Sequence, residues 1–100
     1  MRRTNSVQIG KDRILKELQI IPGVGKSIAN DLYDIGIKKV TDLKGKSPNK
    51  LYKKLNKYSG VKNDICVLYT FRCAVYFASE SRHKKEKLNW WFWNDKVYID

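Results

Sequence analysis

The chain has 100 residues, of which 21 are Lys or Arg and 10 are Asp or Glu, so its formal net charge is +11. This length suits one small domain and is too short for a nucleotide-binding sheet with a substrate lobe. There is no run of 18 apolar residues and no apolar segment after the basic start. We therefore expect a cytoplasmic protein without a membrane span or signal peptide, and the charge favours an anionic partner such as nucleic acid.

Residues 11–36 are predicted to form two short helices around a glycine-rich turn. In the first, at 11–19, the apolar residues share one face: Ile14, Leu15 and Leu18. Pro22-Gly23 ends this helix. After the turn, Ile28, Ala29, Leu32 and Ile35 recur at helical spacing, and Gly36 is placed to end the second helix.

The turn itself, IPGVGKS (Ile21 to Ser27), ends like a nucleotide-binding P-loop. That motif needs a glycine five residues before Gly25, where this chain has Ile20. It also needs a strand in front of it and a parallel sheet around it, which the helical pattern does not supply. The P-loop interpretation is therefore rejected.

Residues 37–46 are predicted to be a connector with a short helical turn, capped by Thr41 and ended by Gly45. Ser47-Pro48 is a strong start signal for the next helix, because Ser caps and Pro suits the first helical position. We expect three residues of this helix to point inward, namely Leu51, Leu55 and Tyr58. Four lysines are expected on its outer side: Lys50, Lys53, Lys54 and Lys57.

The most apolar segment runs from Asn63, a predicted N-cap, to about Ser79 and contains no Gly or Pro. Its length favours a buried central helix, with a strand as the alternative. Cys66 and Cys73 are seven residues apart on this helix, beyond disulfide reach, and His83 does not complete a common zinc spacing. We expect reduced thiols and no metal or other cofactor. Residues 81–100 are a charged segment and a Trp-rich tail.

An offset of 37 residues, which aligns Gly60 with Gly23, reveals a degenerate internal repeat. Apolar positions match across it, with Ile21 opposite Tyr58, Val24 opposite Val61 and Ile28 opposite Ile65. The second copy has Lys62 where the first has Gly25. The repeat predicts one all-α domain (residues 1–100) made of two similar helix pairs, at 11–36 and 47–80, around the connector at 37–46.

The first turn resembles the helix-hairpin-helix family, whose motif is present as Ile21, Pro22, Gly23, Val24, Gly25 and Ala29. The resemblance implies a tandem helix-hairpin-helix fold of the SAM-like, five-helix type. A second likeness covers Ile21 to Leu43 and the stretches NDICVLYTFRCAVYFA and KLNWWFWND, which look like the small bacterial pathogenicity-locus proteins. Related sequences have been labelled mitomycin-resistance proteins, which implies a role linked to DNA repair or damage resistance.

Phosphate binding is expected at the first turn. Backbone N–H groups of Gly23, Val24 and Gly25 lead into a helix N-terminus, and Lys26 and Ser27 add charge and a hydroxyl. Glycines at 23 and 25 are expected to permit backbone angles closed to other residues, and the Val24 side chain is expected to enter the core. By the repeat, the mirror contact uses Gly60, Val61, Lys62 and Asn63. The lysines at 50, 53, 54 and 57 form a secondary basic face that either contacts DNA or is simply solvated.

The predicted function is sequence-nonspecific binding of duplex or branched DNA without catalysis, because backbone contacts position a protein without reading bases. RNA and a protein partner remain open, as does the oligomeric state. The alternative is a protein-interaction or adaptor module that uses the tail residues Trp90, Trp91 and Trp93, which otherwise close the core or stack on bases. An enzyme is disfavoured, because the chain offers one His and no clustered carboxylate pair.

Overall fold

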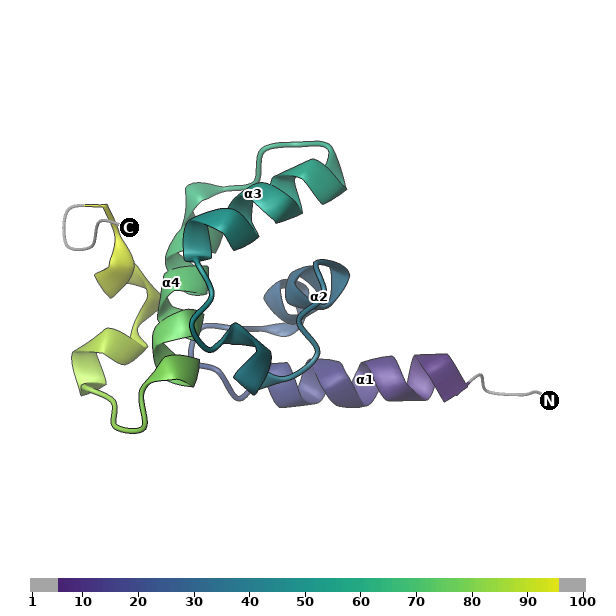
Figure 1. Cartoon of the computed structure of the whole chain (residues 1–100), viewed down its shortest axis with the longest axis horizontal. Helices are drawn as coiled ribbons and strands as arrows, with labels where there is room; N and C mark the ends of the chain where they lie inside the picture. The colour runs from purple at the N-terminus through teal and green to yellow at the C-terminus, as the bar shows by residue number, and fades with distance from the viewer. Residues whose placement is uncertain (1–5, 96–100) are drawn as a thin grey trace.

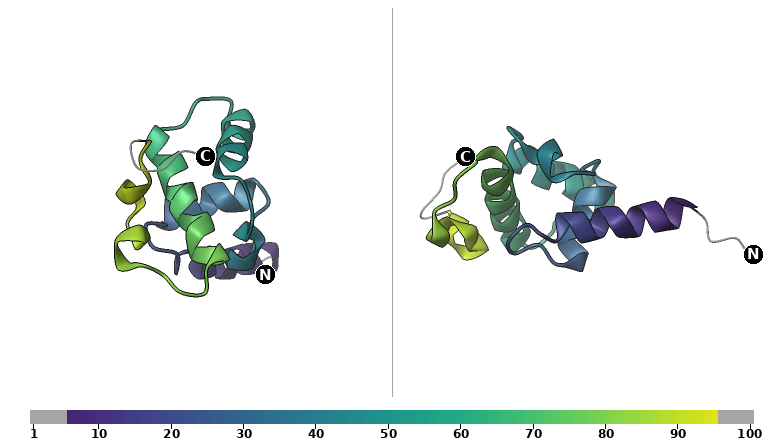
Figure 2. Two further views of the ribbon diagram at one scale, coloured as in Figure 1. Left: turned by 60° about the vertical axis from the view of Figure 1, so that its left-hand side comes forward. Right: turned by 90° about the horizontal axis from the view of Figure 1, so that it is seen from below.

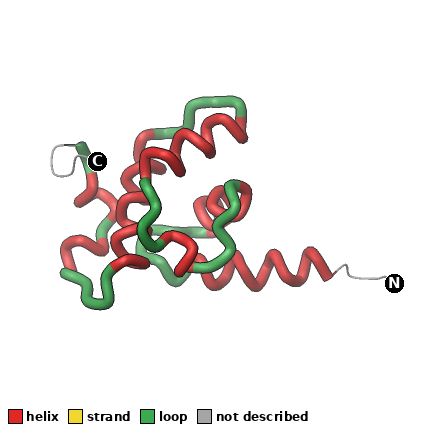
Figure 3. The backbone as a smooth tube through the Cα atoms, viewed as in Figure 1, coloured by secondary structure: helices red, strands yellow, loops and turns green. Residues whose placement is uncertain are grey.

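Helices account for all the regular structure in the computed structural model, which describes residues 6–95 (Figures 1 and 3). The elements, in chain order, are α1 (Ser6–Leu18), α2 (Lys26–Asp34), η1 (Val40–Leu43), α3 (Pro48–Ser59), α4 (Ile65–Ser79), η2 (Lys85–Leu88) and η3 (Trp90–Trp93), where η marks a short 3-10 helix. The all-α prediction is confirmed, and the strand alternative for the apolar segment is wrong. Residues 96–100 of the predicted tail lie outside the described residues.

Helix α4 is the central element. It packs against α3 and η1 on one side and against η2 and η3 on the other, while α2 packs on α1 and α3 (Figures 1 and 2). The predicted buried central helix is thus confirmed, and it contributes Leu68, Phe71, Cys73 and Ala74 to the buried residues. Each large apolar side chain buried here contributes about 1.5–3 kcal/mol of transfer free energy.

Several helix ends lie where the sequence predicts them. The Ser47 hydroxyl accepts a hydrogen bond from the N–H of Lys50 at 3.3 Å, which caps α3. Gly60 ends α3 in the left-handed conformation. At the end of α2, the N–H of Gly36 donates to Tyr33 and that of Ile37 donates to Leu32, the paired bonds of a Schellman motif.

Other helix boundaries differ from the predicted ones. Helix α1 begins at Ser6 rather than at residue 11, because Gly10 is accommodated inside it at the modest cost of a helical glycine. In Figure 2 its N-terminal part projects beyond the other helices. Thr41 does not cap η1. Instead the Asp42 carboxylate accepts the N–H groups of Lys38 and Lys39, at 3.0 and 3.1 Å, and a charged acceptor is stronger than a hydroxyl.

The predicted roles of Tyr58 and Asn63 are wrong as well. Tyr58 is 63% exposed, whereas Tyr52 is buried and its hydroxyl donates to the carbonyl of Asn63. Asn63 does not cap α4, because its backbone and side-chain N–H groups donate to the side-chain oxygen of Asn56, at 2.7 and 2.8 Å. The next residue, Asp64, caps α4.

The three tail tryptophans lie in different environments. Trp93 is buried, and its indole N–H donates to the carbonyl of Lys87 at 2.9 Å. The buried Arg72 donates to the Trp93 carbonyl at 2.7 Å and pairs with Asp95 at 2.9 Å, which fixes η3 on α4. Trp90 is half-buried and Trp91 is 57% exposed. Core packing is therefore confirmed for Trp93 only.

Candidate nucleic-acid interface

The first turn, Ile21 to Ser27, whose last two residues begin α2, is anchored by two apolar side chains. Ile21 and Val24 are both buried, so the expectation that Val24 enters the core is confirmed. The N–H of Val24, however, donates to the carbonyl of Ile21 at 3.0 Å. This donor is used inside the turn, so it is not open to a phosphate in this conformation.

Gly23 has a structural role in the turn. Its φ of +84° lies in the left-handed region, which side chains rarely adopt. A Cβ at this position would lie 3.4 Å from the side chain of Trp90. Trp90 therefore occupies the side of Gly23 on which a side chain would lie, while Gly23 itself remains exposed.

Gly25 differs from Gly23. Its φ of −91° and ψ of −171° are extended values that any residue adopts, so the expectation of special backbone angles is wrong here. A Cβ at this position would meet no atom within 4 Å. Gly25 is the N-cap of α2, and its carbonyl accepts the first helical hydrogen bond, from Ala29 at 2.9 Å.

The N-terminus of α2 is open. It has no side-chain cap and no acidic residue in its first turn, and Gly25, Lys26 and Ser27 are all exposed. Within the described part of the chain, the N–H groups of these three residues donate to no acceptor. Together with the partial positive charge of the helix dipole, these donors favour an anion in this position.

The second turn, residues 60–64, copies the first only in part. Gly60 has a φ of +77°, which matches Gly23. Val61, in contrast, is 64% exposed, whereas its counterpart Val24 is buried. Hydrogen bonds from Asn63 to Asn56 stabilise this turn, so its conformation does not depend on burying the Val61 side chain.

Asp64 makes the second turn electrostatically different from the first. Its carboxylate accepts the N–H of Cys66 at 2.8 Å, and this hydrogen bond lowers the pKa of Asp64. The α4 N-terminus therefore already holds an anion. Gly60, Val61, Lys62 and Asn63 do not form a mirror of the first site. The sequence already indicates this difference, because the 37-residue offset places the carboxylate of Asp64 opposite the hydroxyl of Ser27.

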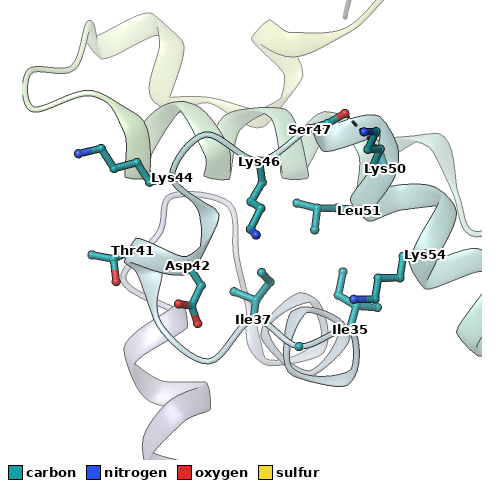
Figure 4. Close-up of a pocket in the computed structure, with 11 residues that line it drawn as sticks. Ile35, Ile37, Thr41, Asp42, Lys44, Lys46, Ser47, Lys50, Leu51 and Lys54 are labelled. Atoms are coloured by element: carbon teal, nitrogen blue, oxygen red, sulfur yellow. Dashed lines mark hydrogen bonds between the residues drawn. The ribbon is translucent and has the colours of Figure 1, made fainter.

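The lysines of α3 divide into two pairs, all of them exposed. Lys50 and Lys54 line a groove together with Lys44 and Lys46, whereas Lys53 and Lys57 do not (Figure 4). Two lysines of the predicted secondary basic face therefore belong to the groove as well.

Both cysteines are free, and burial raises the pKa of Cys73 to about 11. No group of three or more potential metal-ligating side chains occurs among residues 6–95. Over the same range, no helix has the length and apolar character needed to cross a membrane.

Comparison with known proteins places the chain in a family. The family model described as Cdd1, pathogenicity locus, matches residues 11–97, which include both turns and η3. No curated protein and no solved structure matches the chain.

Proposed function

The chain belongs to the pathogenicity-locus family, and from the geometry of its first turn we propose that it is a non-enzymatic, sequence-nonspecific DNA-binding protein. In this proposal, α1, the first turn and α2 form a helix-hairpin-helix unit that holds a backbone phosphate. Helix α3, the second turn and α4 form a degenerate copy with a weaker part in binding.

The observation that carries the proposal is the uncapped N-terminus of α2. Helices α3 and α4 each have a side-chain acceptor there, from Ser47 and Asp64, whereas α2 has none. Unpaired N–H groups at an exposed helix N-terminus bind phosphate oxygens well, and Lys26 adds a full charge.

The net charge supports a polyanionic partner. At +11, the chain attracts phosphate over a long range, and contacts to the backbone alone carry no sequence information. We propose duplex or branched DNA as the partner, with binding that weakens as salt is added.

The test is Gly25→Asp, measured by fluorescence anisotropy with labelled duplex DNA. The N-cap backbone of Gly25 suits Asp, whose carboxylate caps α2 and occupies its N–H groups, so the variant folds as well as the wild type. Loss of one charge-assisted contact and the added repulsion are expected to weaken binding at least about tenfold.

Two matched variants complete this experiment. Gly10→Asp adds the same charge at an exposed position of α1 and is expected to change affinity less than about twofold. Gly25→Asn caps α2 without a charge and is expected to bind between the wild type and Gly25→Asp. If Gly25→Asp binds DNA like Gly10→Asp, the proposed site is wrong.

A second candidate function is a protein-interaction module, which the exposure of Trp91 favours. A Trp that is 57% exposed presents a large apolar surface of the kind found at binding hot spots. Trp91→Ala is expected to leave both stability and DNA affinity unchanged if DNA binding is the function. A loss of DNA affinity equal to that of Gly25→Asp would move the interface to the tail.

A further inference from the structure

A groove lies between the end of α2, η1 and the first turns of α3. It has a volume of about 590 Å³, within the range of pockets that hold small ligands. Its lining comes from three separate parts of the chain, at residues 35–37, 41–47 and 50–54 (Figure 4). A concave site of this size is a candidate for a small molecule.

The groove has a strong excess of positive charge. Four lysines line it, Lys44, Lys46, Lys50 and Lys54, against the single carboxylate of Asp42, which leaves a formal charge of +3. That carboxylate already accepts two backbone N–H groups. Among residues 6–95 none of the four ammonium groups has an ion pair or a hydrogen bond. An anionic ligand would relieve this repulsion.

The side chains are arranged for a compact, highly charged ligand. In Figure 4, Lys46 and Lys54 extend into the groove from different sides, and Lys44 points away. Ile35, Ile37 and Leu51 also line the groove, but all three are core side chains that are buried, so the accessible lining is mainly polar. The Lys54 ammonium passes close over Gly36, where a Cβ would lie 3.9 Å from the nitrogen.

From this arrangement we propose that the groove binds a small-molecule polyphosphate, of the class of the nucleoside triphosphates. Lys46 and Lys54 hold the phosphate chain, with Lys50 beside it. The groove favours a small molecule over a DNA strand, because its lining converges from three separate segments on a volume of about 590 Å³. This site is independent of the proposed DNA site, since the two lie at opposite ends of α2, about 14 Å apart along its axis.

Isothermal titration calorimetry with ATP, inorganic tripolyphosphate and adenosine tests the proposal. The wild type is expected to bind ATP and tripolyphosphate at one site and adenosine not at all. Lys46→Gln with Lys54→Gln is expected to weaken ATP binding at least about tenfold. Lys53→Gln with Lys57→Gln removes the same charge from exposed positions outside the groove and is expected to change it less than about twofold.

Three results would overturn the proposal. The first is absence of ATP binding by the wild type, and the second is an equal loss of ATP affinity in the two double variants. The third is displacement of ATP by a single-stranded oligonucleotide without terminal phosphates, at a stoichiometry of one strand per groove. All titrations are repeated in Gly25→Asp, which retains the groove. Retained ATP binding there, with loss of duplex binding, separates the two sites, so either proposal can fail alone.

Discussion

Gly23 and Gly25 are two residues apart and meet different physical demands. Gly23 needs a positive φ, and a side chain there would contact Trp90, whereas Gly25 has ordinary angles and open space where a side chain would lie. A sequence motif with two glycines cannot distinguish these roles, because both residues are simply small. The distinction matters for the site, since the position without a structural need for glycine is the one at the open helix N-terminus.

This difference predicts opposite effects on stability. Gly23→Ala is expected to lower the free energy of unfolding by about 1–2 kcal/mol, because an L residue is strained in the left-handed region. Gly25→Ser is expected to leave it unchanged or raise it, because Ser caps a helix at least as well as Gly. Urea unfolding followed by circular dichroism measures both. Equal losses in the two variants would contradict the assigned roles.

The two cysteines are expected to differ in reactivity. The buried Cys73 has a pKa raised from 9.0 to about 11 by burial, whereas Cys66 is only half-buried. At pH 8, a thiol reagent should label Cys66 first and Cys73 only as the protein unfolds. Mass spectrometry of the labelled peptides checks the order, and faster labelling of Cys73 would contradict its burial.

The same thiol makes stability depend on alkaline pH. The folded pKa lies above the unfolded one, so the neutral thiol's contribution is fully present below pH 9 and is lost as pH rises toward about 11. The Cys73→Ala variant lacks this contribution. The stability difference between wild type and variant should therefore shrink over that interval.

At the scale of elements, the predictions succeeded where a local rule decides the outcome. Ser47-Pro48 begins α3 and Gly60 ends it, because capping chemistry and a positive φ depend on neighbouring residues alone. They failed where contacts from distant segments decide. Leu51 and Leu55 are buried as expected, but the third inward residue is Tyr52, which reaches the second turn, and not Tyr58.

In the candidate site, too, the features set by neighbouring residues could be predicted and those set by distant contacts could not. The open N-terminus at Gly25 to Ser27 was within reach of the sequence, because a glycine N-cap and a basic first turn can be read directly. The packing of Trp90 beside Gly23 was not, because these residues are 67 positions apart in the chain. The repeat suggested a symmetrical pair of sites, and one carboxylate, Asp64, removes the symmetry.

Asp64 therefore offers a gain-of-function prediction. Asp64→Ser places at the α4 N-cap the residue type that the 37-residue offset aligns with it, and Ser preserves the cap without a charge. Removal of the carboxylate is expected to strengthen duplex binding several-fold. It should also steepen the plot of log affinity against log salt concentration by about one unit of slope, which corresponds to one more released counterion. Anisotropy titrations at several salt concentrations measure both quantities. Unchanged affinity and slope would mean that the second turn takes no part in binding.

At the scale of the whole molecule, the charge is largely unneutralised. Among residues 6–95, Arg72 is the only Lys or Arg side chain in an ion pair, and its partner is Asp95. The molecule extends 52 × 33 × 19 Å, so many of its charges lie within a few Debye lengths of one another at low salt. A net charge of +11 under these conditions destabilises the folded state through self-repulsion.

Salt should consequently act in opposite directions on folding and on DNA binding. Between about 0.01 M and about 1 M NaCl, the Debye length falls from ~30 Å to ~3 Å, which screens the repulsion and should raise the melting temperature. Over the same range DNA affinity should fall, because salt reduces the gain from counterion release. Thermal melts and anisotropy titrations in matched buffers measure the two trends. The double variant Lys53→Gln with Lys57→Gln should show a smaller rise in melting temperature than the wild type.

Because added salt is expected to stabilise the folded protein, loss of DNA binding at high salt cannot come from unfolding. A melting temperature that falls together with affinity would remove that separation and contradict the assignment of the excess charge to phosphate recognition.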